Sequence, residues 1–237
     1  MTLTTSLLYV VLSAIGATLA GAGLNRWVLP VLQTAVFFPV YFRHLQHKEW
    51  KQAFGLSLVW AVSLSATVSL LSWYAPERAS EMIINGEQYQ AEMFSWIATG
   101  EGAETDIGRF LPLQVTHLLL FTVLTLVSGG LLGLLMGSVL LNYMSFYVGT
   151  LLGHATNVIG VLALAWPPWA MLRVAGFILI AIVLSSLAYR RVGLQSLGFD
   201  LEKHIGRKGL ILLILDILLK WGLAPLWQTW LSRLTVL

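Results

Sequence analysis

The longest uncharged stretch of the chain runs from Phe110 to Leu172 and holds 63 residues without an Asp, Glu, Lys or Arg. A soluble domain of this size needs a solvated face with charged side chains, so the stretch cannot belong to one. Because about 20 apolar residues span the hydrocarbon core of a bilayer, it is long enough for two crossings and a turn. This feature predicts an integral membrane protein.

The composition of the whole chain agrees with this prediction. Of its 237 residues, 57% are hydrophobic and 11% are charged, whereas soluble proteins carry about 25% charged residues. At about 20 residues for each crossing, this length allows at most seven or eight helices and no separate soluble domain. We therefore expect one all-α membrane domain over residues 1–237, a polytopic helical bundle.

Two further counts limit the chemistry of the chain. The sequence has no cysteine, which excludes disulfides, thiolate metal sites and cysteine nucleophiles. Its pI of about 9.3 fits cytoplasmic loops that face anionic lipid, so we expect membrane lipid and no nucleic acid as a partner.

The apolar segments predict about seven crossings. The first two form an N-terminal helical hairpin within residues 7–43, and six crossings remain if this short hairpin is re-entrant. Within 110–172, a Gly-rich two-helix core, we place the turn between helices at Asn142–Ser145 and the end of the second helix at Trp166. The first core helix is expected at 113–137. The other three crossings are expected at 55–73, 169–189 and 210–231.

One segment of the chain, residues 76–109, is polar and acidic. It carries seven acidic residues against Arg78 and Arg109, a balance of −5. Its apolar residues recur at helical spacing, which predicts an amphipathic helix on the outer membrane surface, interrupted near Asn85–Gly86.

Basic residues in short loops predict the orientation of the helices. The connectors 43–54 and 190–208 hold eight of the fourteen Lys and Arg residues, which places both in the cytoplasm. The uncharged stretch must then contain two helices that are joined inside the cell. Three helices would place the connector 190–208 outside the cell, against its basic charge. This predicts an N-terminus inside and a C-terminus outside, in a bacterial or archaeal cytoplasmic membrane.

The sharpest candidate site is the pair Asp216 and Lys220 in the last helix. Lys220 lies ten residues after Leu210, about 15 Å along the helix and close to the middle of the membrane. The spacing i, i+4 with the acid first lets the two charges meet, so one interpretation is a self-neutralising pair. The other is an ion, proton or anionic-headgroup site that faces a cavity.

The remaining candidates are expected to be structural. Two histidines, His117 and His154, are expected to be buried and bonded between helices, because their depths differ too much for haem ligation. Asn142 and Asn157 are expected to bond between helices as well. We expect close helix packing at a series of glycines: Gly129, Gly133, Gly137, Gly149 and Gly153.

Three further polar positions are assigned to surfaces. His44 and His47 lack carboxylate or cysteine partners, so we interpret them as a solvated face and not as a zinc site. Arg173 lies near an outer helix end, where its side chain can reach the headgroups. We expect no metal, no cofactor and no catalytic residues.

From Gly55 onward, the order of features resembles the stage II sporulation protein M family and its membrane relatives. The residues that carry the resemblance are the glycine-rich helix at 128–133, Asn142, the Trp166–Pro168 turn, Arg190–Arg191 and the Ala224–Pro225 step. Residues 7–43 and the Asp216/Lys220 pair lie outside this pattern. The resemblance implies a non-enzymatic membrane component of a larger assembly that remodels the cell envelope.

The sequence thus predicts a non-enzymatic membrane protein that acts as a scaffold or permease-like subunit. Other membrane subunits or further copies of the chain are the expected partners. Two alternatives stay open: a stand-alone transporter or channel whose path is lined by Asp216 and Lys220, and a membrane-embedded redox or lipid-modifying enzyme subunit.

Overall fold

The computed structural model describes residues 3–237, and every regular element in that range is an α-helix. The helices are, in chain order, α1 (Leu3–Gly21), α2 (Val28–Gln46), α3 (Trp50–Tyr74), α4 (Pro76–Met82), α5 (Gly86–Thr99), α6 (Ile107–Ser128), α7 (Leu131–Gly153), α8 (Val158–Ala165), α9 (Pro168–Arg191) and α10 (Phe199–Leu234). Seven of them are long and apolar enough to cross a membrane: α1, α2, α3, α6, α7, α9 and α10. The predicted all-α class and the number of such helices are confirmed.

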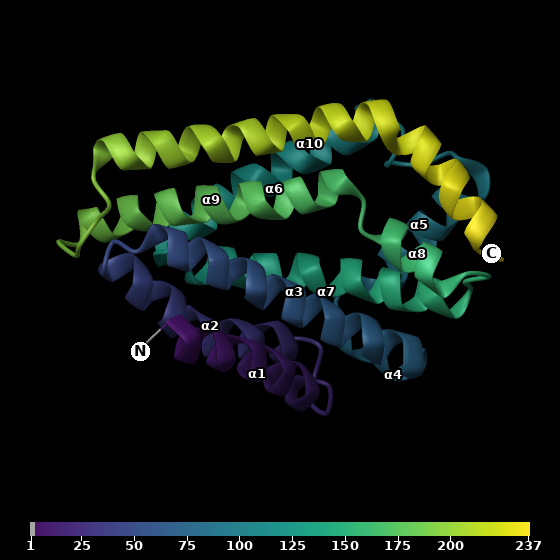
Figure 1. Ribbon diagram of the computed structural model, residues 1–237, viewed down its shortest axis with the longest axis horizontal. Coiled ribbons are helices and arrows are strands. Elements are labelled where there is room, and N and C mark those ends of the chain that lie inside the picture. The colour runs from purple at the N-terminus through teal and green to yellow at the C-terminus, as the bar shows by residue number, and fades with distance from the viewer. Residues whose placement is uncertain (1–2) are drawn as a thin grey trace.

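The long helices form a bundle, with the connectors after α2 and α9 at one end and α4 and α5 of the acidic segment at the other (Figure 1). The turns after α2 and after α9 lie together, since Gln46 Nε2 donates to the backbone oxygen of Gln195. We call this the basic end. The opposite end carries α4, α5, α8 and the C-terminus, and we call it the acidic end.

The turn inside the uncharged stretch lies at Gly129–Gly130, so its predicted position at Asn142–Ser145 is wrong. Both glycines adopt positive φ angles, 63° and 102°, which favour glycine because a Cβ is strained there. The Tyr189 hydroxyl donates to the Gly129 oxygen at 2.6 Å and fixes the turn at the basic end. Gly129 is therefore a helix terminator and does not belong to a helix-packing face with Gly133.

The second helix of the uncharged stretch ends at Gly153 and not at Trp166. The chain turns at residues 154–157, and α8, of eight residues, follows as a separate short helix at the acidic end. Backbone hydrogen bonds join this turn to the C-terminal segment, with Thr156 N donating to Leu234 O at 2.8 Å. The reason is local: the Asn157 side chain caps α8 by accepting from Gly160 N, which starts a new helix.

The N-terminal hairpin forms two helices of 19 residues each, α1 and α2. A buried amide holds it to the bundle: Gln33 Nε2 donates to Thr18 Oγ1 at 3.0 Å and to Asn142 Oδ1 at 3.2 Å. The Gln33 Oε1 atom accepts from Ser138 Oγ at 2.6 Å and from Asn142 Nδ2 at 2.8 Å. Asn142 thus bonds between helices, and these buried polar groups satisfy one another.

Two glycine contacts bring long helices close together. A Cβ at Gly149 of α7 would clash with the Ser69 carbonyl oxygen of α3, so only glycine permits this approach. Gly176 of α9 and Gly209 of α10 also face each other, since a Cβ added at either would lie 3.2 Å from the carbonyl oxygen of the other. Of the other predicted packing glycines on α7, Gly133 meets Thr125, whereas Gly137 and Gly153 have open space beside them.

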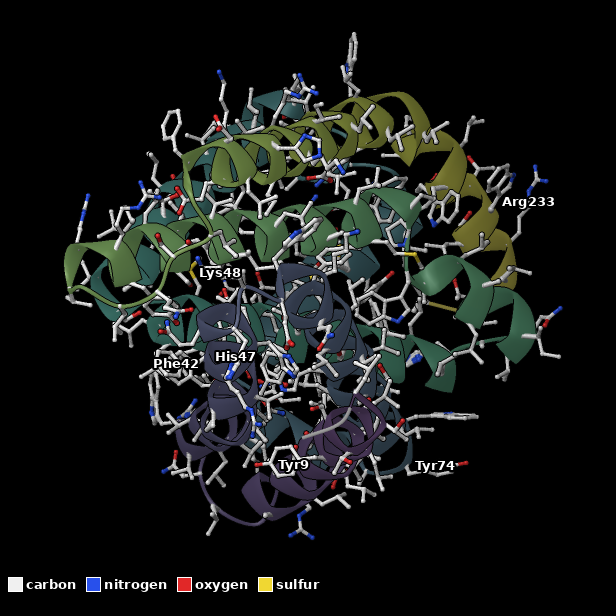
Figure 2. All side chains as sticks on the ribbon, turned by 60° about the vertical axis from the view of Figure 1, so that its left-hand side comes forward. Tyr9, Phe42, His47, Lys48, Tyr74 and Arg233 are labelled. Carbon is white, nitrogen blue, oxygen red and sulfur yellow. The ribbon has the colours of Figure 1, made fainter. Side chains whose placement is uncertain are left out.

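At the basic end, the two connector histidines differ in exposure, so the predicted solvated face is half wrong. His47 is exposed beside Lys48 in the turn between α2 and α3 (Figure 2). His44 is 4% exposed, and its Nδ1 atom lies 2.6 Å from Glu49 Oε2. The connector after α9 is held by Glu202, which is buried against Ser186 and Arg190.

Candidate functional site

The two charged residues of α10 lie inside the bundle but do not pair with each other. Asp216 is fully buried and Lys220 is 3% exposed. Each makes its ion pair with a residue from another part of the chain. Of the two interpretations of Asp216 and Lys220, the self-neutralising pair is therefore wrong, and α10 takes part in two separate charge contacts.

The first contact joins α10 to α9 and α6. Arg173 donates to Asp216 through two nitrogens, with Nε–Oδ2 at 2.9 Å and Nη2–Oδ1 at 3.0 Å. The Gln114 side-chain amide of α6 donates to the same Oδ2 atom. This forked geometry is the strong form of an arginine–carboxylate pair. Arg173 therefore bonds inside the bundle, and its predicted extension toward headgroups is wrong.

The close approach of α9 and α10 explains how this pair forms. Gly176 and Gly209 bring the two backbones together within about one turn of Arg173 and about two turns of Asp216. A larger side chain at either glycine would separate the helices. The glycine contact therefore positions the ion pair.

The second contact joins α10 to the acidic segment. Lys220 Nζ lies 2.8 Å from Glu104 Oε1, and their side chains are 4% and 15% exposed. The same ammonium lies 4.6 Å from the ring centroid of Phe110 in α6, within reach of a cation–π interaction. A glutamate that composition assigns to a solvated loop thus neutralises a lysine inside a long apolar helix.

The local sequence explains how Glu104 enters the bundle. Helix α5 ends at Thr99 and is capped by Gly100, which adopts a left-handed conformation with φ 78°. The Thr105 hydroxyl donates back to Gly100 O at 2.9 Å, and Asp106 caps α6 by accepting from Gly108 N at 2.8 Å. These bonds fold residues 100–106 into a tight turn, with Glu104 held between its ends.

The acidic segment is built into the bundle, and the apolar face that was predicted to lie on lipid packs against other helices instead. The predicted interruption near Asn85–Gly86 is present, between α4 and α5. The apolar face of α5 is buried against α7 and α10 through Met93, Trp96 and Ile97. The Gln228 side chain of α10 also donates to the Ile97 oxygen at 2.6 Å.

A cavity of about 100 Å³, which we call the charged cavity, lies beside these ion pairs. Its charged lining consists of two acids and two bases: Glu92, Glu104, Arg173 and Lys220. The remaining lining includes Tyr89, Tyr143, Gln114 and His117. This volume holds several water molecules, and its polar lining offers them partners. The charged cavity can therefore hold a small group that carries both charge signs.

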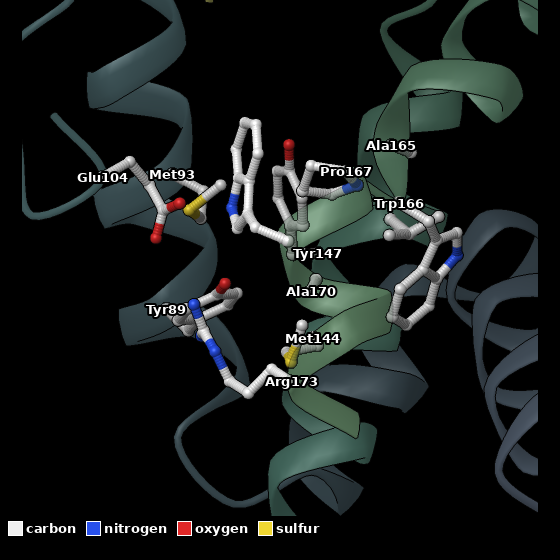
Figure 3. Close-up of a pocket in the computed structure, with 12 residues that line it drawn as sticks. Tyr89, Met93, Glu104, Met144, Tyr147, Ala165, Trp166, Pro167, Ala170 and Arg173 are labelled. Carbon is white, nitrogen blue, oxygen red and sulfur yellow. The ribbon is translucent and has the colours of Figure 1, made fainter. Parts of the chain in front are cut away.

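A smaller recess of about 20 Å³ adjoins the charged cavity and shares Tyr89, Glu104 and Arg173 with it. Figure 3 shows the Arg173 side chain extending across this recess, with its guanidinium beside Tyr89. Burial raises the pKa of the Tyr89 hydroxyl well above its ordinary value, and the Glu104 carboxylate raises it further. Tyr89 therefore stays neutral and can donate a hydrogen bond.

The other predicted polar positions have different fates. His117 lines the charged cavity and is half-buried. His154 is exposed at the end of α7, where it packs against Phe94, so its predicted burial is wrong. Asn157 is also exposed and caps α8, and it does not bond between helices.

Within residues 3–237, no group of three or more His, Cys, Asp or Glu side chains is arranged to hold a metal ion. The chain matches no family model, no curated protein and no solved structure. The resemblance to the stage II sporulation protein M family therefore stays a prediction.

Sequence reasoning missed three partners in this site: Glu104, Gln114 and the inward-facing Arg173. The sequence contains one signal for them, since an uncompensated Asp and Lys inside an apolar helix require partners. It does not identify those partners, because Asp216 and Lys220 are themselves spaced i, i+4 on one helix. By sequence spacing alone, they could pair with each other.

Proposed function

We propose that the chain is a multi-pass protein of a bacterial or archaeal cytoplasmic membrane, with the basic end inside and the acidic end outside. The seven crossing-length helices support the membrane assignment, and the basic connectors support the orientation. In this orientation, the N-terminus lies inside, the C-terminus lies outside, and the charged cavity lies near the outer face.

In that membrane the chain acts as a non-enzymatic, permease-like protein that binds a charged group in the charged cavity. The observation that carries this proposal is the pair of contacts Arg173–Asp216 and Lys220–Glu104, which join α9, α10 and the acidic segment. Buried ion pairs contribute little net stability compared with apolar packing, so packing alone does not require them. Ionisable residues inside membrane helices commonly mark a substrate path.

The ion pairs also provide a means of switching. Each pair joins segments that are far apart in the chain, and a ligand that competes for one partner loosens that connection. A permease needs two arrangements of its helices, and exchange of charge partners is one way to bias them. Lys220–Glu104 is the better candidate for exchange, because it is a single contact, whereas Arg173–Asp216 is forked.

Accessibility of single cysteines tests the proposal, and the cysteine-free sequence makes this experiment direct. His117→Cys places a thiol in the charged cavity, and Leu119→Cys places one on the exposed apolar face of the same helix. We expect a membrane-impermeant maleimide to label the first variant from both sides of the membrane and to leave the second unlabelled. Labelling of His117→Cys from one side only, or from neither, overturns a permease.

Neutral substitution of both members of one ion pair separates the permease from the scaffold alternative. In Glu104→Gln with Lys220→Gln, which leaves neither charge of the pair unpaired, the permease proposal predicts loss of two-sided labelling at position 117 while the protein still inserts and co-purifies with its partners. Loss of partner association with unchanged labelling would instead favour a scaffold in a larger assembly.

A further inference from the structure

A second cavity of about 80 Å³, which we call the apolar cavity, adjoins the charged cavity. Its lining residues are apolar except for Arg173. The two cavities share four lining residues: Leu140, Met144, Arg173 and Phe177. The two cavities are therefore adjacent, and we treat them together as one candidate site with a charged end and an apolar end.

The site is elongated along the helices. On α9 its wall runs from Arg173 to Ala181, eight residues or about 12 Å of helix. On the facing wall, α7 contributes Met144 at the charged end and Gly133 at the apolar end. One leaflet of the hydrocarbon core is about 15 Å thick, so the site covers most of one leaflet.

A further observation indicates that the apolar cavity has room for a ligand. Gly137 lines it, and a Cβ added there would meet nothing within 4 Å, so neighbouring side chains do not fill the space.

The charges of the site select the polar part of the ligand. The Lys220–Glu104 ion pair lines the charged cavity, so a ligand that carries one charge of each sign can meet both partners without leaving either unpaired. A purely anionic group at Lys220 would leave Glu104 buried without its partner. A zwitterion can place its anion at Lys220 and its ammonium near Glu104, beside the rings of Tyr89 and Tyr143.

We infer that the two cavities together bind a membrane lipid with a zwitterionic headgroup, of the phosphoethanolamine type. The headgroup occupies the charged cavity and the first part of one acyl chain occupies the apolar cavity. The charged cavity lies nearer the acidic end, and the apolar cavity extends from it toward the middle of the bundle. A lipid in the leaflet on the acidic side has its headgroup and acyl chains in this order. The inference rests on the proposed permease function and names the class of its ligand.

Retained lipid tests the inference directly. The purified protein is reconstituted in nanodiscs with equal parts phosphatidylethanolamine and phosphatidylglycerol, transferred to detergent and weighed by native mass spectrometry. We expect one phosphatidylethanolamine on each chain. Retention of mainly phosphatidylglycerol overturns the zwitterionic class, and retention of neither lipid overturns the site.

A matched pair of variants locates the acyl chain. Gly137→Leu fills the apolar cavity, whereas Gly153→Leu adds the same side chain in open space on the same helix, outside the cavity. We expect the lipid-bound fraction to fall at least tenfold in Gly137→Leu and to stay unchanged in Gly153→Leu. Equal retention in both variants overturns the inference.

A measurement on the unsubstituted protein covers the case in which Gly137→Leu fails to fold. Phosphatidylethanolamine with a diazirine in its acyl chain is crosslinked in nanodiscs, and the labelled residues are identified. Labels on Leu141 or Ile178, inside the apolar cavity, support the site; labels confined to exposed positions such as Leu119 overturn it. Loss of lipid with unchanged labelling of His117→Cys would reject only the lipid, and leave the permease proposal intact.

Discussion

The ammonium group of Lys220 lies 2.8 Å from a carboxylate oxygen of Glu104, although 116 residues separate the two in the chain. Lys220 belongs to α10 and Glu104 to the turn between α5 and α6. The contact holds the acidic segment against the last helix and closes one side of the charged cavity. A ligand that breaks the Lys220–Glu104 contact in the charged cavity would therefore also loosen the attachment of the acidic segment.

Glu104→Gln should destabilise the protein, because it leaves the buried Lys220 ammonium without an anionic partner. We expect a loss of about 3–5 kcal/mol in the free energy of unfolding, measured by denaturant titration in mixed micelles. The control is Glu101→Gln, an exposed residue of the same turn, for which we expect a change within about 0.5 kcal/mol. Equal losses in the two variants would contradict the role of the contact.

The Arg173–Asp216 pair should show strong coupling in a double-mutant cycle. Arg173→Gln and Asp216→Asn each leave one buried charge unpaired, and each should lower the free energy of unfolding by about 3–5 kcal/mol. The double variant removes both charges, so its loss should be smaller than the sum of the single losses by about 1–3 kcal/mol. Additive losses would mean that the two side chains act independently.

The contact of α3 with α7 should tolerate no side chain at Gly149. Gly149→Ala places a Cβ against the Ser69 carbonyl oxygen and should lower the free energy of unfolding by about 1–3 kcal/mol. Gly153→Ala, on the same helix but in open space, should leave stability unchanged or raise it by up to about 1 kcal/mol. The reverse order of the two variants would refute close packing at Gly149.

The buried amide of Gln33 should contribute to the attachment of the N-terminal hairpin. Gln33→Leu leaves Asn142 and Ser138 without their main partner, which should lower the free energy of unfolding by about 1–3 kcal/mol. Gln88→Leu, at an exposed position of α5, serves as the control and should change stability by less than about 0.5 kcal/mol. Proteolysis of the variant should also release the hairpin first, and intact hairpin contacts in Gln33→Leu would be inconsistent with this role.

The two ends of the bundle should face opposite sides of the membrane. Lys48→Cys at the basic end and Glu87→Cys at the acidic end are exposed, so an impermeant maleimide can reach both. In intact cells, we expect labelling of the Glu87 variant alone, and in inverted vesicles labelling of the Lys48 variant alone. Labelling of both variants from one side would reject the proposed orientation.

Local patterns allowed much of the fold to be predicted. The number of crossing-length helices, the interruption near Asn85–Gly86 and the gathering of the basic connectors at one end all follow from hydropathy and charge. Helix boundaries within 110–172 were misplaced, because that stretch has no charge to mark a turn. The Gly129–Gly130 pair was the available signal, since two adjacent glycines end a helix more readily than they pack one.

The sequence by itself determined that the chain is all-helical, that seven helices can cross a membrane, and that Asp216 and Lys220 need partners inside the bundle. Those properties depend on composition and on spacing along one helix. Only the tertiary structure decided which partners they take, Arg173 and Glu104, and that a charged and an apolar cavity adjoin at Arg173. Such contacts depend on how helices far apart in the chain pack, and the spacing of residues within a single helix carries no information about that.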